Sequence, residues 1–302
     1  MLLGWLRWGG VVQTGLMLIS FGLGSMSCVQ RGPSAGTRSP SPSTSSSPSS
    51  PSPTGTASGG GSVFVIVLEN QSYDQVLNDQ YFSGLASQYA IATNYHAITH
   101  PSAPNYLALT SGSTWGVRDD GYHVLPAQGL GDQLDAAGVS WNVYAEGLTS
   151  DCLNSPYPYA VKHNPFAYYG GPCSPNIVPM TTLAGDLAGT TPRLAWIIPN
   201  MCNDGHDCGL STVASWLGSV VPQVVASAAW QSHGLLFITW DEDDGSSVNQ
   251  VATFVIAPDL KVHSSGVRYD HYSLLATIED RLGVGRRGAA KSARSMSDLV
   301  PA

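Results

Sequence analysis

Apolar and polar positions follow one another in blocks along most of this chain, and the blocks predict a sheet of buried strands. Residues 63–68 form an apolar run that stops at Glu69 and Asn70, a pattern typical of a strand buried on both faces of a parallel sheet. Four further apolar segments end in the same way: residues 140–146, 193–200, 234–241 and 251–260. Helical patterns lie between them, over residues 81–89, 105–111, 129–137, 211–230 and 272–282. The alternation predicts an α/β fold with a mostly parallel central sheet and helices on both faces.

The polar side chains that follow these strands are expected to meet at one edge of the sheet. In open α/β sheets, ligands bind at the carboxyl ends of the strands, where loops and helix starts converge. The cluster expected there consists of Glu69, Asn70, Asn200, Asp241 and Glu242. Carboxylates placed together raise one another's pKa and destabilise the fold unless a cation joins them. The cluster therefore predicts a divalent metal ion, and oxygen ligands suit Ca²⁺, Mg²⁺ or Mn²⁺.

Two simpler interpretations of the acidic block at residues 241–247 stay open. The first is a solvated acidic turn with no ligand. The second is a structural calcium loop, although the block departs from EF-hand spacing because Gly245 takes the place of a ligand and no glutamate closes the loop.

The beginning of the chain differs in composition from the rest. An uncharged apolar stretch, residues 9–26, follows Arg7, which is typical of an export signal. Cys28 comes directly after it in a sequence loosely similar to a lipobox, whose cysteine is lipidated after cleavage. We therefore expect a signal segment over residues 1–28 and a membrane anchor at Cys28. A plain secretory signal and an uncleaved anchor are the alternatives.

A linker and a folded domain follow the signal segment. Residues 29–61 are rich in Ser, Thr, Pro and Gly, and they carry too little apolar surface to offset the entropy of ordering, so a disordered linker is expected. Residues 62–302 are long enough for one domain with a sizeable core.

Cysteine usage and charge narrow the location and the partners. Of the five cysteines, Cys28 is isolated, and the other four form an even set that suits two disulfides outside the cytoplasm. Pairing of Cys152 with Cys173 and of Cys202 with Cys208 is the simplest of the three connectivities. The net charge of −8 argues against duplex nucleic acid as a partner, since that needs a basic face. A phosphorylated small molecule or lipid stays compatible with this charge if a metal ion supplies positive charge locally. No pattern indicates an oligomeric state.

Residues 99–112 place a serine at the start of a predicted helix. Pro104 suits the first turn and Gly112 suits the end, so Ser102 is expected at the N-cap. There its oxygen would face free backbone amides and the positive end of the helix dipole, which hold a phosphate and favour a developing alkoxide. Taken alone, the motif fits an ordinary capping serine better than a nucleophile.

Six blocks occur in order along the domain: VIVLENQSYD, HPSAPNYLALTSG, VKHNPF, PNMCNDGHD, ITWDEDDGS and YDHYSLLATIED. Together they resemble the bacterial phosphoesterase family of secreted acid phosphatases and non-zinc phospholipases C, and the small secreted acid phosphatases in particular. The resemblance extends over residues 63–283 and implies the alkaline phosphatase superfamily fold.

The resemblance implies a nucleophile and a metal site. Ser102 matches the nucleophile, and Glu69 and Asn70 match a pair that binds metal and phosphate. Asp241 and Glu242 match the metal-binding acidic pair, although this chain has DEDDG where the family has D-E-H-G-G. This departure leaves open whether Asp243 or Asp244 also binds the metal.

Further residues are expected to contact the substrate. The resemblance implies that His206 and His271 lie near the transferred phosphate, with catalytic roles. Asn105, at the start of the predicted helix, would add a hydrogen-bond donor. Lys162 and His163 lie in a loop that the first disulfide would hold, and they would contact the phosphate or the leaving group. A solvated loop is the alternative for these two residues.

The sequence therefore predicts an extracytoplasmic hydrolase, either secreted or lipid-anchored. The expected reaction is that of an acid phosphatase, in which a phosphomonoester is hydrolysed through a metal-assisted covalent phosphoserine. Two alternatives stay open: a phosphodiesterase or phospholipase C on the same core, and a non-catalytic, calcium-stabilised surface binding protein.

Overall fold

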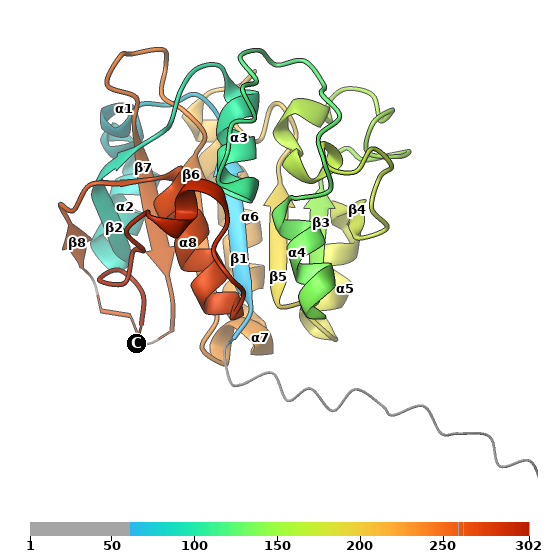
Figure 1. Ribbon diagram of the computed structural model, residues 1–302. Coiled ribbons are helices and arrows are strands. Elements are labelled where there is room, and N and C mark those ends of the chain that lie inside the picture. Colours follow the sequence, from blue (N-terminus) through green and yellow to red (C-terminus); the bar gives the residue numbers. More distant parts are fainter. Residues whose placement is uncertain (1–60, 259, 262, 302) are drawn as a thin grey trace, which may run out of the picture. The chain divides into compact units, whose positions relative to one another are not determined.

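The central sheet of the computed structural model contains the expected strands and several more (Figure 1). The structure describes residues 61–258, 260–261 and 263–301. The predicted signal segment, Cys28 and nearly all of the predicted linker lie outside these residues. The described residues belong to one compact unit, Gly55–Ala302.

In the described residues, nine strands form a single sheet in the order β4-β3-β5-β1-β6-β7-β2-β8, and β9 also pairs with β2. Their bounds are β1 Val63–Leu68, β2 Ala90–His96, β3 Trp141–Ala145, β4 Ile177–Pro179, β5 Leu194–Ile198, β6 Leu235–Trp240, β7 Gln250–Ile256, β8 Ser264–Ser265 and β9 Tyr269–Asp270. Among the described strands, β7 alone runs antiparallel to its neighbours, β6 and β2. The prediction of a mostly parallel α/β sheet is thus confirmed.

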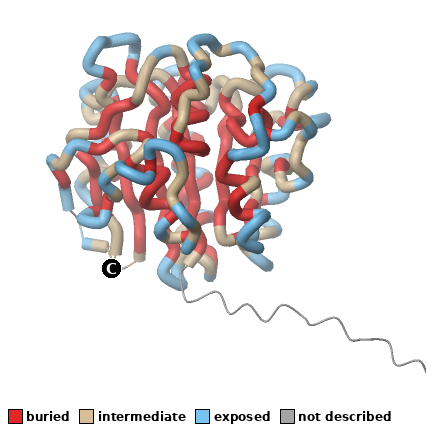
Figure 2. The backbone as a smooth tube through the Cα atoms, viewed as in Figure 1, coloured by how far each residue is buried: buried red, intermediate tan, exposed pale blue. Residues whose placement is uncertain are grey.

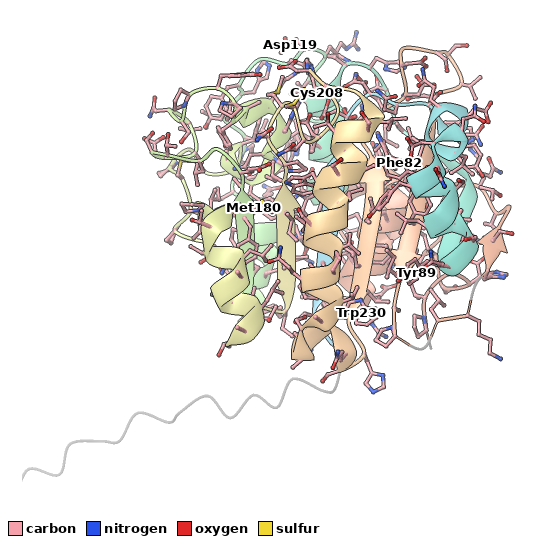
Figure 3. All side chains as sticks on the ribbon, turned by 180° about the vertical axis from the view of Figure 1, so that it is seen from behind. Phe82, Tyr89, Asp119, Met180, Cys208 and Trp230 are labelled. Carbon is pink, nitrogen blue, oxygen red and sulfur yellow. A yellow bond between two sulfur atoms is a disulfide. The ribbon has the colours of Figure 1, made fainter. Side chains whose placement is uncertain are left out.

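Helices cover both faces of the sheet, as the alternating pattern predicts. Their bounds are α1 Tyr73–Asn78, α2 Gln80–Gln88, α3 Ser102–Ser111, α4 Leu130–Ala137, α5 Leu183–Ala188, α6 Leu210–Ala226, α7 Ala228–Gln231 and α8 His271–Leu282, with short 3₁₀ turns η1 Val161–His163, η2 Pro165–Ala167, η3 Met180–Thr182 and η4 Gly288–Lys291. Helices α3, α4 and α8 lie on one face (Figure 1), and α1, α2, α5 and α6 lie on the other (Figure 3).

The position of β1 in the core explains why its sequence is an unbroken apolar run. This strand lies between β5 and β6, pairs in parallel with both, and has all six residues buried. Figure 2 shows the same burial along the central strands, with exposed backbone confined mainly to loops and helix surfaces. Each fully buried Val, Leu or Ile side chain contributes roughly 1.5–3 kcal/mol to stability.

Several elements, including α1, α5 and the short strands β4, β8 and β9, were not predicted, and three further differences have a physical reason. Strand β7 runs antiparallel to β6, so its carboxyl end, Ile256, points away from the edge at which β1 and β6 end. The predicted end near Asp259 falls on a residue outside the described ranges. Strand β2 escaped prediction because Thr93 and Asn94 break its apolar run where the pairing with β7 is irregular. The predicted helix over residues 211–230 divides at Ser227, whose side chain accepts a hydrogen bond from Trp230 N and begins α7.

Both disulfides have the predicted pairing. Cys152 pairs with Cys173, with a Cα–Cα distance of 5.8 Å, and Cys202 pairs with Cys208, at 4.7 Å. The first bridge closes part of the long connection between β3 and β4, and the second closes the turn before α6 (Figure 3). Closing a loop of about 20 residues stabilises the fold by roughly 3 kcal/mol.

Within the part of the chain that the structure describes, every helix is too short or too polar to cross a bilayer.

Candidate active site

Three carboxylates converge where β1 and β6 end. The two strands are neighbours in register, with Leu68 beside Trp240, so the residues that follow them, Glu69 and Asp241, are brought side by side. The Asp241 amide donates a hydrogen bond to the Leu68 carbonyl, at 2.9 Å. Glu242 comes next in the chain, and all three acidic side chains are buried. The structure therefore brings together the acidic residues that the strand pattern predicts at this edge.

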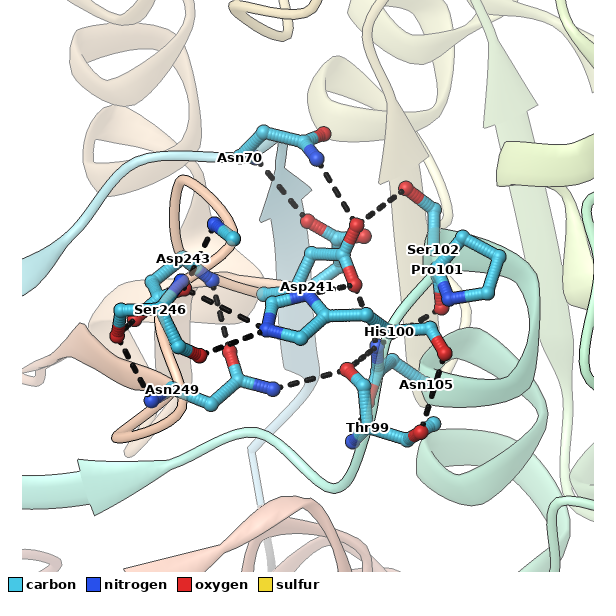
Figure 4. A network of polar contacts seen from close by, with 12 residues as sticks. Asn70, Thr99, His100, Pro101, Ser102, Asn105, Asp241, Asp243, Ser246 and Asn249 are labelled. Carbon is cyan, nitrogen blue, oxygen red and sulfur yellow. Dashed lines mark hydrogen bonds and ion pairs between the residues drawn. The ribbon is translucent and has the colours of Figure 1, made fainter.

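Asn70 ties the two strand ends together (Figure 4). Its backbone has φ of 44°, a left-handed conformation that asparagine tolerates better than most residues. This turn lets its amide donate to Asp241 Oδ1, at 3.2 Å, while its side-chain Nδ2 donates to Glu242 Oε1, at 2.9 Å. Its Oδ1 is buried without a hydrogen-bond partner and is available to a ligand.

Ser102 reaches the carboxylates from the start of α3. Its Oγ donates to Glu69 Oε2, at 2.9 Å, and lies 3.4 Å from Glu242 Oε1. Pro101 holds the N-cap, so Ser102 is the first residue of the helix and not the cap that the sequence predicts. One turn later, Tyr106 donates to Glu69 Oε1, at 2.5 Å. This tyrosine was missed by sequence reasoning, and its four-residue spacing from Ser102 is the signal that could have found it.

The acidic cluster has the electrostatics of a cation site. Burial, with the Asp241 charge adding to it, raises the pKa of Glu69 well above its ordinary range. Burial and the neighbouring Glu242 charge do the same for the pKa of Asp241. Asp241 Oδ2 is buried without a partner, as is Asn70 Oδ1. These oxygen donors fit a hard divalent ion, whose charge would relieve the repulsion.

A second group of candidate metal ligands also includes Glu69. Glu69, His163 and His206 each offer one ligand atom, and these atoms lie within 4.8 Å of one another, so the three residues could hold a metal ion. His163 is buried: its Nδ1 donates to Asp204 Oδ2, at 2.9 Å, which leaves Nε2 facing Glu69 Oε1, at 3.2 Å. Burial lowers the pKa of His163, which favours the neutral ring that a metal requires. Sequence reasoning assigned both histidines to the substrate or to catalysis and did not select Asp204.

Lys162 and His206 lie on a more exposed wall of the site. Lys162 Nζ donates to His206 Nε2, at 3.0 Å, and to Asp120 Oδ2, at 3.3 Å. His206 Nδ1 in turn donates to Asp207 Oδ1, at 2.8 Å. The lysine side chain is 19% exposed, so it is not the freely solvated residue of the alternative interpretation.

His271 does not lie where a catalytic histidine is expected. It is buried at the start of α8, with Nε2 at 2.6 Å from the Asp241 backbone carbonyl and Nδ1 at 3.0 Å from the Tyr95 hydroxyl. Burial lowers its pKa to about 4. Both ring nitrogens are engaged behind the acidic pair, and no contact joins the ring to Ser102.

Two asparagine side chains that the sequence places at the site, those of Asn105 and Asn200, instead form hydrogen bonds with the nearby backbone. Asn105 accepts from the amides of Ile98 and Thr99 through Oδ1, and its Nδ2 donates to Thr99 O, at 2.8 Å, and approaches Glu242 Oε2 at 3.3 Å. It shapes the loop before Ser102 and presents no free donor. Asn200 Oδ1 caps its own turn by accepting from the amides of residues 202 and 203, so it does not join the acidic cluster.

The acidic block after β6 also contains structural residues. Asp243 accepts from the amides of Gly245 and Ser246, which closes the turn (Figure 4). Asp244 points outward and accepts from Gln75 Nε2, at 3.1 Å. These hydrogen bonds give both aspartates partners outside the cluster of Glu69, Asp241 and Glu242.

His100 was missed by sequence reasoning and contacts the site directly. Its Nδ1 donates to Glu242 Oε2, at 2.8 Å, and its Nε2 lies 3.0 Å from the Ser246 carbonyl (Figure 4). Burial acts to lower the pKa of His100, but the Ser246 carbonyl and the Glu242 carboxylate outweigh it and raise that pKa. Its position two residues before Ser102 is the sequence signal that could have identified His100 as a site residue.

The model of the phosphoesterase family matches residues 78–285 of this chain. The chain belongs to the phosphoesterase family. This confirms the family resemblance, although the first of the six sequence blocks, residues 65–74, precedes the matched range.

Relatives of known name are similar to much of this domain. An acid phosphatase of Aspergillus fumigatus is 30% identical over 266 residues, which cover 78% of this chain and 58% of that protein. A phosphatidylinositol-3-phosphatase of Mycobacterium tuberculosis is 31% identical over 249 residues, covering 78% of this chain and 82% of that protein. The chain spans a little under three fifths of the length of the fungal acid phosphatases that it matches.

Solved structures show the same fold at low identity. A protein of the alkaline phosphatase superfamily from Vibrio parahaemolyticus has a TM-score of 0.57 and 12% identity, with 80% of this chain and 72% of that chain covered. Murine ectonucleotide pyrophosphatase/phosphodiesterase 5 has a TM-score of 0.55 and 10% identity, with 80% of this chain and 100% of that chain covered. The expected alkaline phosphatase-like fold is thus confirmed.

Proposed function

We propose that this phosphoesterase family member hydrolyses phosphomonoesters through a covalent phosphoserine on Ser102. The observation that carries the proposal is the Ser102 hydroxyl, which is buried at the start of α3 and lies within 3.4 Å of two carboxylates. The acid phosphatases among its relatives support a monoester substrate.

A divalent metal ion fits the oxygen donors of the site. The residues that would hold it are Glu69, Asn70, Ser102, Asp241 and Glu242, and the group of Glu69, His163 and His206 is a second candidate. When bound, such an ion supplies positive charge that favours the serine alkoxide and neutralises phosphoryl oxygens.

The residues of the chain account for the protons and the orientation of the substrate. The Ser102 proton leaves along its hydrogen bond to Glu69 Oε2 as Oγ attacks phosphorus. Lys162 and the Ala103 amide donate to phosphoryl oxygens, because the Ala103 amide directly follows the nucleophile and Asp120 joins it to Lys162. With the metal ion held by the first of the two candidate groups and Lys162 turned to the phosphate, His206 Nε2 is free to carry a proton, while Nδ1 keeps its bond to Asp207. Nε2 then protonates the leaving oxygen and afterwards accepts a proton from the water that hydrolyses the phosphoserine. We assign His271 a positioning role: its Nε2 contacts the backbone carbonyl of Asp241 and holds that residue in place.

The proposal predicts a clear preference for monoesters. Purified protein is expected to hydrolyse para-nitrophenyl phosphate at least about 100-fold faster than the bis-ester, and a chelator is expected to abolish turnover until metal is restored. Faster turnover of the diester would favour the phosphodiesterase alternative. A folded, calcium-binding protein that turns over neither substrate would favour the non-catalytic binding protein.

Replacement of His206 tests the assigned acid. We expect His206→Asn to lower kcat by about 10²-fold for an alkyl phosphate and much less for para-nitrophenyl phosphate, because a good leaving group needs no proton. His123→Asn is the matched control, since the His123 side chain is 42% exposed and its Nε2 bonds to Asp119 Oδ1, at 2.7 Å. An equal loss on both substrates would contradict the role of His206 as an acid.

The location and the natural substrate are also proposals. The two disulfides support a protein that works outside the cytoplasm. A lipid anchor at Cys28 stays a prediction. The phosphatidylinositol-3-phosphatase relative makes phosphorylated lipids one candidate class of substrate beside small phosphomonoesters.

A further inference from the structure

Asp120 is a carboxylate at the site to which the proposed mechanism assigns no role. Asp120 lies in the irregular segment between α3 and α4, and its side chain is 35% exposed. Its Oδ1 accepts a hydrogen bond from the Ala103 amide, at 3.0 Å, and its Oδ2 lies 3.3 Å from Lys162 Nζ. Asp120 therefore joins two donors that come from separate parts of the chain.

Both donors are groups that a phosphoryl oxygen would use. The Ala103 amide directly follows the nucleophile and belongs to the first turn of α3, where free amides and the helix dipole favour an anion. Lys162 Nζ also contacts His206 Nε2, at 3.0 Å, which connects it to the candidate proton donor. A carboxylate bonded to both donors thus stands where oxygens of the transferred phosphate are expected.

A phosphate that entered beside Asp120 would meet a like charge in a partly buried site, which disfavours both anions staying there. With its side chain partly exposed, Asp120 can turn into solvent without unfolding an element.

We propose that the Asp120 carboxylate competes with the phosphoryl group of the substrate for the Ala103 amide and Lys162. The carboxylate holds the Ala103 amide and Lys162 until a phosphate displaces it, and it returns when the product leaves. The apparent affinity for phosphate is then reduced by the fraction of time for which the carboxylate blocks the donors. This inference rests on the function proposed above, since it assigns the displaced position to the transferred phosphate.

Calorimetric titration with inorganic phosphate, at fixed metal concentration, tests the proposal without turnover. We expect Asp120→Asn to bind phosphate about tenfold more tightly than the wild type, and Asp120→Ala to bind more tightly still. The asparagine keeps an oxygen for the Ala103 amide and removes the charge, whereas the alanine removes both. Asp119→Asn is the matched control, because Asp119 is exposed and bonds only to Gly121 N and His123; its affinity is expected to stay within about twofold of the wild type.

The outcomes separate this inference from the proposed function. Unchanged or weaker phosphate binding in both Asp120 variants, at an unchanged melting temperature, would overturn the competitor role even if the wild type hydrolyses monoesters. Tighter binding in the variants would support it even if the wild type turned over no monoester, a result that would count against the proposed function alone. Absence of phosphate binding in all four proteins would overturn both.

Discussion

Replacing Ser102 with alanine is expected to lower kcat for phosphomonoesters by at least roughly 10⁴-fold, because the substitution removes the oxygen that would carry the phosphoryl group. The fold should be retained. Ser102 is the first residue of α3, its Oγ bonds only to carboxylates of the site, and the helix cap is formed by Pro101. Initial rates with para-nitrophenyl phosphate, together with a thermal melt, measure both effects.

Ser111→Ala is the matched control for this substitution. Ser111 lies at the other end of the same helix, and its hydroxyl donates to the Leu107 carbonyl, away from the carboxylates. We expect its kcat to stay within about threefold of the wild type. If Ser102→Ala kept more than about a hundredth of the wild-type rate, direct attack by water would replace the covalent route in this account.

Replacing Asp241 with asparagine is expected to change activity and stability in opposite directions. Activity should fall at least about 10³-fold, because the site loses a charged ligand beside the nucleophile. In the presence of a chelator the melting temperature should rise, since one of the buried carboxylates that repel one another is removed while Oδ1 still accepts from Asn70 N. The rise corresponds to roughly 2–4 °C for each kcal/mol of relieved repulsion.

The control and the pH dependence sharpen this second prediction. Asp244→Asn removes a charge from the same block of sequence, but at an exposed residue that contacts Gln75, and should change neither activity nor melting temperature appreciably.

In the chelated wild type, the raised pKa values of Glu69 and Asp241 mean that the folded protein holds protons which the unfolded chain has already released. Stability is therefore complete below the ordinary carboxyl pKa and falls as the pH rises above it. A chelated variant that melts below the wild type at pH 7 would contradict the proposed repulsion.

The strand pattern was sufficient to predict the acidic centre of the site. The apolar run of β1 ends at Glu69 because the strand is buried on both faces, and β6 ends in the same way at Asp241. Two parallel neighbours in register must bring their following residues together, so the cluster follows from strand order alone. Strand direction is the part that the pattern does not contain, which is why the end of β7 was placed at the wrong edge.

Side-chain partners were less predictable than residue positions. Asn105 and His271 lie in the motifs that resemble the family, yet their polar atoms are engaged by backbone groups and by Tyr95. Such contacts depend on loops whose course the sequence does not specify. His100 and Tyr106 were missed for the same reason, because each meets its carboxylate only after the loop before α3 has turned.

The stereochemical course at phosphorus tests the covalent phosphoserine most directly. A phosphorothioate monoester made chiral with oxygen isotopes would be hydrolysed in isotopically labelled water, and the configuration of the product would be determined. Two successive in-line displacements, first by Ser102 and then by water, predict retention of configuration at phosphorus. Inversion would mean a single displacement by water and would contradict the account.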